Sequence, residues 1–284
     1  MTDVLVFGRS GQVARELQHL APVLALGREA APLEQPGACS AAILAHRPRA
    51  VINAAAYTAV DHAEENQALV SAINGSAPRE MALACAALKI PLVHISTDYV
   101  FPGTGEAPWA PDDATVPVNA YGRSKWMGEE GIRTSGATHA ILRTSWVFSP
   151  HGNNFVKTML RLSDTHDEIS VVNDQIGGPT PARSIAAACL IIARQLQDTP
   201  AKTGTFHFTG MPDTSWCSFA RTVFASADLP TRVKSIPTSA YPTRAVRPLN
   251  SRLDCRTTTA VFGLTRPDWH KGLKECLTDL GVST

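Results

Sequence analysis

The chain has 284 residues, with 26 basic against 25 acidic side chains and no block of like charge. That length suits one large domain or two modest ones with a sizeable core, and the balanced charge argues against nucleic acid or an anionic membrane as a partner. The six cysteines are scattered without metal spacing, which is typical of reduced thiols. No apolar run approaches the roughly 18 residues of a membrane span, and no signal-peptide pattern opens the chain. A soluble, cytoplasmic protein is expected.

The first predicted element is a short apolar strand over 4–7, which runs into a glycine turn and an amphipathic helix to Leu20. The turn has the spacing G-x-x-G-x-x-A, with Gly8, Gly11 and Ala14 at the marked positions. Glycines allow close backbone approach, and a helix N-terminus can accept pyrophosphate charge. At the first strand-to-helix junction this turn predicts a dinucleotide site, although such turns also occur as plain connectors.

A second strand is predicted over 23–26, and it ends at Gly27 and Arg28. Folds that prefer NAD commonly place an acidic residue here to bind the ribose 2′-hydroxyl. Gly27 instead leaves room, and Arg28 offers a positive charge that suits a 2′-phosphate. The pattern therefore favours NADPH, with NADH possible because Arg28 is equally well explained as an ordinary surface residue.

Two further strands end in residues that suit a site. The strand over 50–52 leads into Asn53 and a run of alanines before Tyr57, small side chains against which a cofactor could lie or which simply pack closely. The strand over 91–95 closes in Ser96 and Thr97, and a hydroxyl there could hydrogen-bond a substrate carbonyl. A long helical pattern over 68–87 separates these strands. The alternation predicts an α/β fold: a Rossmann-like, doubly wound, mostly parallel sheet with helices on both faces.

The motif Tyr121-x-x-x-Lys125 follows a proline-rich loop over 102–117, for which we predict a mobile flap. On a helix these two side chains share one face. An ammonium beside a phenol favours the phenolate and lowers its pKa from about 10, so the pair predicts a proton donor for a carbonyl oxygen. Taken alone, the spacing also fits an ordinary surface pair.

The second half is less regular. A fifth strand over 139–142 leads to Trp146, and a smaller lobe is expected beside the sheet. Its predicted elements are helices over 153–162, 183–197, 216–227 and 267–280, strands over 169–172 and 205–208, and loops over 241–254. We predict a dinucleotide-binding domain over 1–150, with a return contribution from about 180–200, and a mainly substrate-binding lobe over 151–284.

Seven stretches carry a resemblance, in order and across most of the chain. They are Gly8-x-x-Gly11-Gln12-Val13, Asn53-Ala-Ala-Ala-Tyr-Thr-Ala-Val-Asp61, Ser96-Thr-Asp-Tyr-Val-Phe101, Tyr121-Gly-Arg-Ser-Lys125, Arg143-Thr-Ser-Trp-Val-Phe148, Val172-Asn-Asp-Gln175 and Arg247-Pro-Leu-Asn-Ser-Arg-Leu-Asp254. Together they resemble the extended short-chain dehydrogenase/reductase superfamily and, within it, the dTDP-4-dehydrorhamnose reductase family.

The resemblance implies reduction of the C4 keto group of a small-molecule dTDP-sugar, dTDP-6-deoxy-L-lyxo-4-hexulose, to dTDP-L-rhamnose, the last step towards the rhamnose of bacterial surface polysaccharides. It implies three sets of site residues. The catalytic set is Thr97, Tyr121 and Lys125; the cofactor set is Gly8, Ser10, Gly11, Gln12, Val13, Arg28, Ala55, Ala56, Tyr57, Tyr121 and Lys125; and the substrate set is Thr97, Asp98, Trp146, Asn173 and Arg247. For Asn173 a loop-fixing role, and for Arg247 a structural salt bridge, are comparable alternatives.

Some members of the family use a carboxylate matching Glu16 for a magnesium-linked dimer. The sequence shows no convincing partner carboxylate, because Arg183 stands where one is sought, so magnesium and a homodimer are left open. Dehydration is disfavoured, since Thr97 is followed by Asp98 and Tyr99 rather than by an Asp-Glu pair. The alternatives are a nucleotide-sugar epimerase on the same scaffold and a non-catalytic NADP-binding regulatory subunit.

Overall fold

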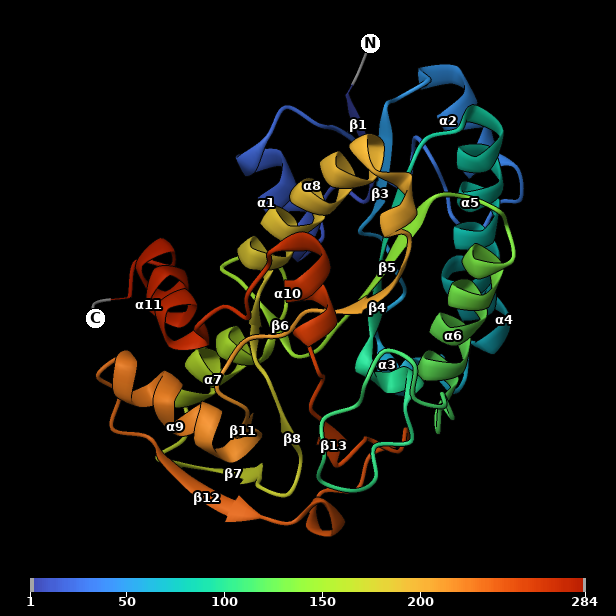
Figure 1. Cartoon of the computed structure of the whole chain (residues 1–284). Helices are drawn as coiled ribbons and strands as arrows, with labels where there is room; N and C mark the ends of the chain where they lie inside the picture. Colours follow the sequence, from blue (N-terminus) through green and yellow to red (C-terminus); the bar gives the residue numbers. More distant parts are fainter. Residues whose placement is uncertain (1–2, 283–284) are drawn as a thin grey trace.

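A six-stranded parallel sheet forms the centre of the computed structural model, which describes residues 3–282 (Figure 1). The strand order is β10-β5-β4-β3-β1-β2, and every neighbouring pair is parallel. The strands are β1 (Val4–Phe7), β2 (Leu24–Leu26), β3 (Ala50–Asn53), β4 (Leu92–Thr97), β5 (His139–Thr144) and β10 (Gly204–His207). The interior strands β1 and β3 are apolar on both faces, as is expected for a sheet covered by helices on both sides.

Helices cover both faces of this sheet, so the larger part of the molecule has three layers (Figure 1). One face packs against α1 (Gln12–Leu20), α8 (Ala182–Asp198) and α10 (Arg256–Phe262). The other face packs against α2 (Ala38–His46), α5 (Ala77–Leu88) and α6 (Ala120–Arg133). The predicted Rossmann-like, doubly wound fold is therefore confirmed.

The sheet changes direction of growth between β1 and β3. After β1, the chain adds β2 on one side, crosses through α2, and then adds β3, β4 and β5 on the other side. Ligands of open α/β sheets bind in the crevice at the carboxyl ends of the strands flanking such a point. In this chain those ends are the glycine turn at Gly8 and the alanine run after Asn53.

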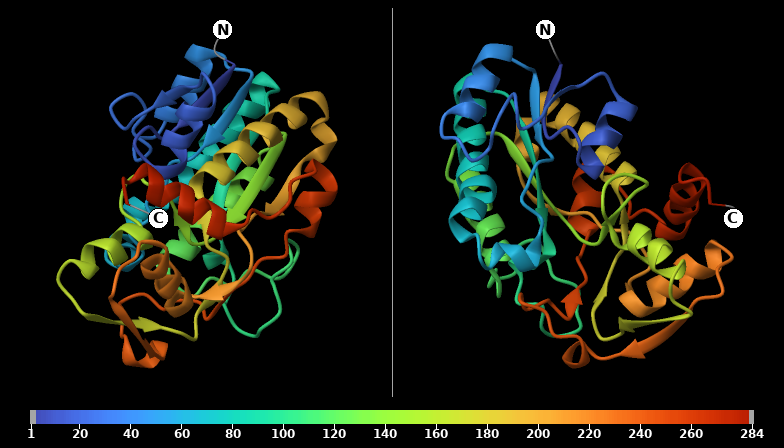
Figure 2. Two further views of the ribbon diagram at one scale, coloured as in Figure 1. Left: turned by 90° about the vertical axis from the view of Figure 1, so that its left-hand side faces the viewer. Right: turned by 180° about the vertical axis from the view of Figure 1, so that it is seen from behind.

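A smaller lobe lies below the carboxyl edge of the sheet and has a hydrophobic core of its own (Figures 1 and 2). That core is built by α7 (Phe155–Ser163), α9 (Trp216–Ser226) and α11 (Trp269–Asp279) around β7 (Glu168–Val172), which pairs with β12 (Arg232–Ile236). Short strands connect the lobe to the sheet, namely β6 (Val147–Phe148) with β9 (Thr180–Pro181), and β11 (Thr214–Ser215), β8 (Ile176–Gly177) and β13 (Asn250–Ser251).

The structure corrects the sequence-based elements in four places. The strand β12 and the helix α10 fall in segments for which we predicted no element. The long helix expected over 68–87 is divided into α4 (Gln67–Ser71), a π-helical turn over Ala72–Ser76, and α5. The proline-rich loop is not free-standing, because Trp109 stacks on Phe101 at 4.9 Å and pairs with Leu253. Within residues 3–282, none of the helices is both long and apolar enough to span a membrane.

Candidate active site

Tyr121 lies in the first turn of α6, where several contacts fix the helix start. The N-cap residue Asn119 accepts a hydrogen bond from the backbone N–H of Gly122 at 2.8 Å and donates one to the carbonyl of Val246 at 2.8 Å. A carboxylate oxygen of Glu64 accepts from the N–H of Ala120 at 2.8 Å. The start of α6 is thus tied both to the sheet domain and to the smaller lobe.

Thr97, at the end of β4, lies beside Tyr121. Burial raises the pKa of the Tyr121 phenol to about 12, and a hydrogen bond with Thr97 partly offsets that rise. The Thr97 hydroxyl also donates to Asp98 at 3.1 Å and accepts from the backbone N–H of Tyr99 at 3.2 Å. The expected lowering of the Tyr121 pKa by Lys125 is wrong for this arrangement, because burial dominates and the phenol remains protonated at neutral pH.

Lys125 shares the inward face of α6 with Tyr121 but points to a different partner. Its ammonium nitrogen donates to the carbonyl of Ile95 at 2.7 Å and lies 3.1 Å from Nε2 of His94. The side chain is buried, and burial lowers its pKa to about 8. The sequence indicated the shared face correctly, but it did not reveal that His94 on β4 is in contact with Lys125.

A cavity opens at the carboxyl ends of β1 and β3. Seven of the predicted cofactor residues line it, namely Gly8, Ser10, Gly11, Arg28, Ala55, Ala56 and Tyr57. Gly8 has a φ of +109°, and a Cβ there would lie 3.2 Å from the backbone of Ala54, so this position requires glycine. The cavity also contains Glu29 and Glu34, acidic residues that the sequence analysis did not consider.

Asn74 holds the far wall of this cavity in place. Its side chain accepts from the N–H of Tyr57 at 2.8 Å and donates to the carbonyl of Tyr57 at 3.0 Å. Asn74 itself lies in the π-helical turn, and its amide also donates to Ser124 on α6 at 3.0 Å. Tyr57 and Tyr121 pack against one hydrophobic cluster, which connects the cavity wall to the Tyr121 helix.

Four of the predicted cofactor residues lie outside the lining of this cavity: Gln12, Val13, Tyr121 and Lys125. Val13 is buried in the core beneath the turn. The side chain of Gln12 accepts from Ser149 at 2.8 Å and from Asn154 at 3.0 Å, and so connects the glycine turn to the smaller lobe. Gln12 and Val13 begin α1 directly after Gly11, which does line the cavity.

Asp98 carries a buried carboxylate oxygen without a partner. The side chain is 2% exposed, and its Oδ2 has no hydrogen-bond partner among residues 3–282. Burial raises the pKa of this carboxyl to about 6. An unsatisfied acceptor beside Thr97 and Tyr121 fits a substrate hydroxyl, because buried polar groups in native structures normally find a partner.

Trp146 follows β5 in a left-handed conformation with a φ of +52°, which is unusual for a large side chain. It stacks on Trp216 with ring centroids 3.7 Å apart and an angle of 13° between the planes. Such strain is retained where the surroundings over-determine it, often at functional sites. The stacked Trp216 ring therefore helps to hold the Trp146 side chain in place.

The two remaining substrate candidates have protein partners. The guanidinium of Arg247 hydrogen-bonds both carboxylate oxygens of Asp61, at 2.7 and 3.2 Å, and thereby lowers the pKa of Asp61. The side chain of Asn173 accepts from Ser215 at 2.7 Å. These contacts are the salt bridge and the loop-fixing role that the sequence left as alternatives.

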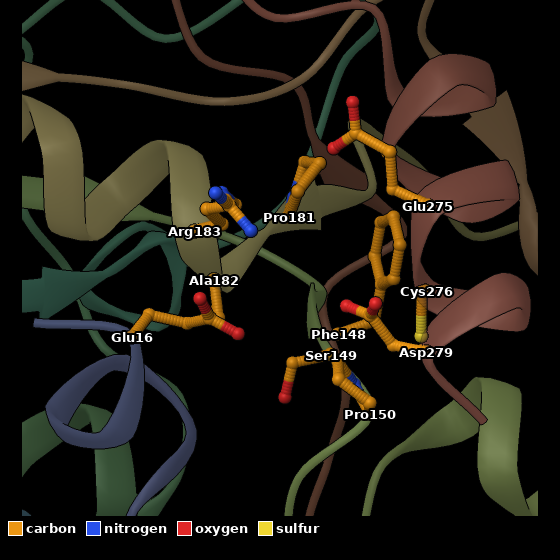
Figure 3. A pocket seen from close by; sticks show the side chains of 11 residues that line it. Glu16, Phe148, Ser149, Pro150, Pro181, Ala182, Arg183, Glu275, Cys276 and Asp279 are labelled. Atoms are coloured by element: carbon orange, nitrogen blue, oxygen red, sulfur yellow. The ribbon is translucent and has the colours of Figure 1, made fainter. Parts of the chain in front are cut away.

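A second pocket surrounds Glu16, at some remove from Tyr121. Figure 3 shows Glu16, Arg183, Glu275 and Asp279 around one hollow, with Pro150 below. The absence of a partner carboxylate, expected from the sequence, is thus corrected, because α11 brings Glu275 and Asp279 to this pocket.

Magnesium does not fit a second group of donors around Glu16. Glu16, His19 and His151 have ligand atoms within 4.8 Å of one another, and two of these three ligands are imidazoles that do not line the pocket of Figure 3. Magnesium prefers carboxylate, carbonyl and water oxygens in octahedral geometry, whereas imidazoles suit zinc, nickel or copper. In addition, Arg183 brings a positive charge to the same pocket.

A buried ionic network lies behind the site and was not foreseen. Glu129 on α6 pairs with Arg143 on β5 through two hydrogen bonds, at 2.9 and 2.7 Å, and also accepts from Ser96 at 2.6 Å and from Arg133 at 2.7 Å. Glu129 and Arg143 are 0% and 1% exposed. The network joins α6, which carries Tyr121, to β4, which carries Thr97, and to the neighbouring strand β5.

Comparisons with known proteins match the chain over nearly its whole length. The family described as RmlD substrate binding domain matches residues 1–282. The dTDP-4-dehydrorhamnose reductase of Burkholderia thailandensis is 42% identical over 98% of this chain and 98% of its own, and that of Sinorhizobium fredii is 40% identical over 95% and 94%.

A solved structure agrees with these relatives. The crystal structure of dTDP-4-dehydrorhamnose reductase from Bacillus anthracis in complex with NADP has a TM-score of 0.90 and 31% identity, and the match covers 98% of this chain and 99% of that one. Sequence identity and fold thus point to the same group of enzymes. The chain belongs to the RmlD substrate binding domain family, the family of the dTDP-4-dehydrorhamnose reductases.

Proposed function

We propose that this chain catalyses the NADPH-dependent reduction of the C4 keto group of dTDP-4-dehydrorhamnose to dTDP-L-rhamnose, the last step of dTDP-L-rhamnose biosynthesis. One observation in the structure carries the proposal: the phenol of Tyr121 lies beside the hydroxyl of Thr97 at the carboxyl edge of the sheet, in a chain that matches reductases over 98% of its length. A phenol and a hydroxyl at this edge can together bind one carbonyl oxygen.

Tyr121 acts in this proposal as the proton donor. Because burial keeps its pKa at about 12, the phenol holds its proton until a substrate oxygen accepts it. Bound NADPH supplies the hydride. Thr97 polarises the same carbonyl by hydrogen bonding, and Lys125 holds the nicotinamide ribose and favours the phenolate that remains after transfer.

Asp98 and Trp146 are proposed to bind the sugar. The unpaired oxygen of Asp98 can accept a hydrogen bond from a sugar hydroxyl, and Trp146 offers an aromatic surface stiffened by Trp216. Arg247 can bind a diphosphate only if it gives up part of its bidentate contact with Asp61. Asn173 can bind the substrate only while its side-chain oxygen also accepts the hydrogen bond from Ser215.

For the cofactor, we propose NADPH, with NADH as a weaker substitute. Arg28 lines the cavity at the end of β2 and can pair with a 2′-phosphate, and the Bacillus anthracis relative was solved with NADP. Glu29 and Glu34 in the same cavity oppose this preference, because carboxylates repel phosphate and can bind a ribose hydroxyl instead. The preference of this chain depends on which charge faces the ribose.

An epimerase on the same scaffold oxidises a sugar hydroxyl and then reduces the resulting ketone, so its cycle consumes no cofactor, whereas the proposed reduction consumes one NADPH. Purified protein incubated with NADPH and dTDP-4-dehydrorhamnose should oxidise one NADPH for each sugar reduced. An epimerase would interconvert sugars without net oxidation, and a regulatory subunit would oxidise none and co-purify with an enzyme partner.

The remaining proposals concern organisation. We propose a homodimer that acts on a small-molecule dTDP-sugar in the cytoplasm, with residues 1–150 and about 180–200 binding the dinucleotide and 151–284 mainly binding the sugar. Light scattering of the purified chain tests the dimer: a mass near twice 30.4 kDa supports it, and a mass of one chain contradicts it.

A further inference from the structure

Three buried polar side chains form a line from the cofactor cavity to Lys125. Asn53, His94 and Lys125 are 1%, 0% and 2% exposed. The amide nitrogen of Asn53 lies 3.0 Å from Nδ1 of His94, and Nε2 of the same ring lies 3.1 Å from the Lys125 nitrogen. Water does not reach these groups, so their hydrogen bonds must be satisfied within the line.

The orientation of the Asn53 amide is fixed by the backbone. Its side-chain oxygen accepts a hydrogen bond from the N–H of Ala55 at 3.1 Å. A backbone N–H is always a donor, so the group that faces it must be the oxygen. The Asn53 NH₂ group therefore faces His94.

This orientation decides the tautomer of His94. Because Asn53 donates to Nδ1, that nitrogen must offer its lone pair, and a neutral ring then carries its hydrogen on Nε2. Nε2–H points at Lys125, which can accept it only through the lone pair of an uncharged amine. The amine still donates to the carbonyl of Ile95 at 2.7 Å.

A charged Lys125 requires the opposite arrangement. An ammonium has three donors and no acceptor, so Nε2 would have to accept and Nδ1 would carry the hydrogen. Asn53 would then have to turn its oxygen towards His94, and the N–H of Ala55 would lose that acceptor. All four groups cannot be satisfied at once when Lys125 is charged.

We propose that Asn53 and His94 form a relay that couples the charge of Lys125 to the hydrogen bond of the Ala55 N–H in the cofactor cavity. His94 is a positioning residue in this relay, since it acts through Lys125. A ligand that accepts the Ala55 N–H frees Asn53 to turn and so favours the ammonium. The consequence of the relay for the reaction rests on the role proposed above for Lys125. The test of the relay does not.

The other charges around the relay are few. Glu129, on the same helix as Lys125, favours the ammonium, but it is paired with Arg143 on β5. His139 on β5 faces His94, and both histidines have pKa values lowered by burial, so both are neutral near pH 7. Burial disfavours a charge on Lys125 as well, which agrees with the hydrogen-bond argument.

The tautomer of His94 tests the relay in the unaltered protein. ¹⁵N NMR of histidine-labelled protein distinguishes a protonated Nε2 from a protonated Nδ1, and contacts to the Lys125 side chain identify the His94 signals. Above the pH at which Lys125 loses its proton, we expect the hydrogen on Nε2. A hydrogen on Nδ1 at every pH would overturn the proposal, whether or not the protein reduces dTDP-sugars.

A variant supplies the second test. In Asn53→Ala, Nδ1 of His94 no longer has to accept from Asn53, so the ring can carry its hydrogen on Nδ1 and accept from a Lys125 ammonium through Nε2. The titration of Lys125, followed by NMR of ¹³C-labelled lysine, should then move up by about one pH unit. His139→Gln is the matched control, because His139 bonds to the carbonyl of Ala137 and not to Lys125. An unchanged midpoint in a folded Asn53→Ala protein contradicts the relay.

Discussion

Gly122 packs directly against the carbonyl oxygen of Tyr99: a Cβ on residue 122 would lie 2.2 Å from that oxygen. Tyr121 meets the ring of Tyr99 edge to face, with centroids 5.5 Å apart. The turn after β4 and the first turn of α6 are thus in contact through backbone, and this contact sets how closely Tyr121 approaches Thr97.

Gly122→Ala should therefore push the start of α6 away from β4. We expect a loss of about 1–3 kcal/mol in the free energy of unfolding from overpacking. We also expect at least a tenfold fall in kcat/KM, because a shift of about 1 Å at a catalytic group can cost about 10²-fold. Thermal unfolding and NADPH oxidation measure the two effects. Arg123→Ala, an exposed neighbour, should change both only slightly, and equal effects of the two variants would contradict this explanation.

Glu129→Gln should destabilise the fold, because it leaves the buried Arg143 guanidinium without its countercharge. Removing one partner of a buried pair typically costs about 3–5 kcal/mol. Denaturant unfolding at pH 7 measures the loss. Glu130→Gln is the control: Glu130 pairs with the half-exposed Arg133 at the surface and should matter by less than about 1 kcal/mol.

The same carboxyl gives a pH dependence. Burial raises the pKa of Glu129, but the hydrogen bonds and charges of Arg143 and Arg133 outweigh it and hold the pKa below the ordinary 4.5. Its contribution to stability is thus complete above pH 4.5 and is lost as the pH falls through the lowered value. Wild type and Glu129→Gln should converge in stability on acidification, and a constant difference down to pH 2 would contradict this.

The sequence predicted the parts of the fold and site that depend on local pattern. The strand at Val4, the glycine turn and the helix at Tyr121 each have a short-range signal, in apolar runs, glycine spacing and i,i+4 spacing. The strand β12 was not predicted because its largely exposed residues carry little apolar pattern. The helix α10 was not predicted because its short run of threonines has weak helical propensity.

The partners of the site residues could not be predicted in this way. Arg247 pairs with Asp61 across 186 positions, and Asn53 meets His94 across 41. Only strand order and register bring such residues together, and neither is encoded in a local pattern. The prediction of a lowered Tyr121 pKa was wrong for a related reason, since the burial that raises this pKa is a property of the folded site.

Asp98→Asn should stabilise the protein while weakening substrate binding. The pKa of Asp98 rises from 3.8 to about 6 on folding, so stability falls as the pH rises from 3.8 to about 6, and the full cost of the buried carboxylate is present above that value. At pH 8 the variant should be more stable by roughly 1–3 kcal/mol, with no gain near pH 4, and its KM for the dTDP-sugar should rise. Thermal unfolding at the two pH values tests this, and a variant less stable than wild type at pH 8 would contradict it.

Arg28→Ala should reduce the preference for NADPH. A charge-assisted contact to the 2′-phosphate is worth about 1.5–3 kcal/mol, so the ratio of kcat/KM for NADPH over NADH should fall about tenfold or more. Arg49→Ala, whose exposed side chain lies beside Asp3 at the opposite edge of the sheet, should leave the ratio unchanged. If Arg28→Ala also leaves it unchanged, the cofactor is selected elsewhere in the cavity.

The central claim is that the Tyr121 phenol delivers the proton, and Tyr121→Phe tests it most directly, because the change removes one oxygen and keeps the ring. NADPH oxidation with dTDP-4-dehydrorhamnose should fall by about 10²–10⁴-fold, while fluorescence titration shows NADPH binding within about twofold of wild type. A folded Tyr121→Phe protein that turns over at nearly the wild-type rate would contradict the account.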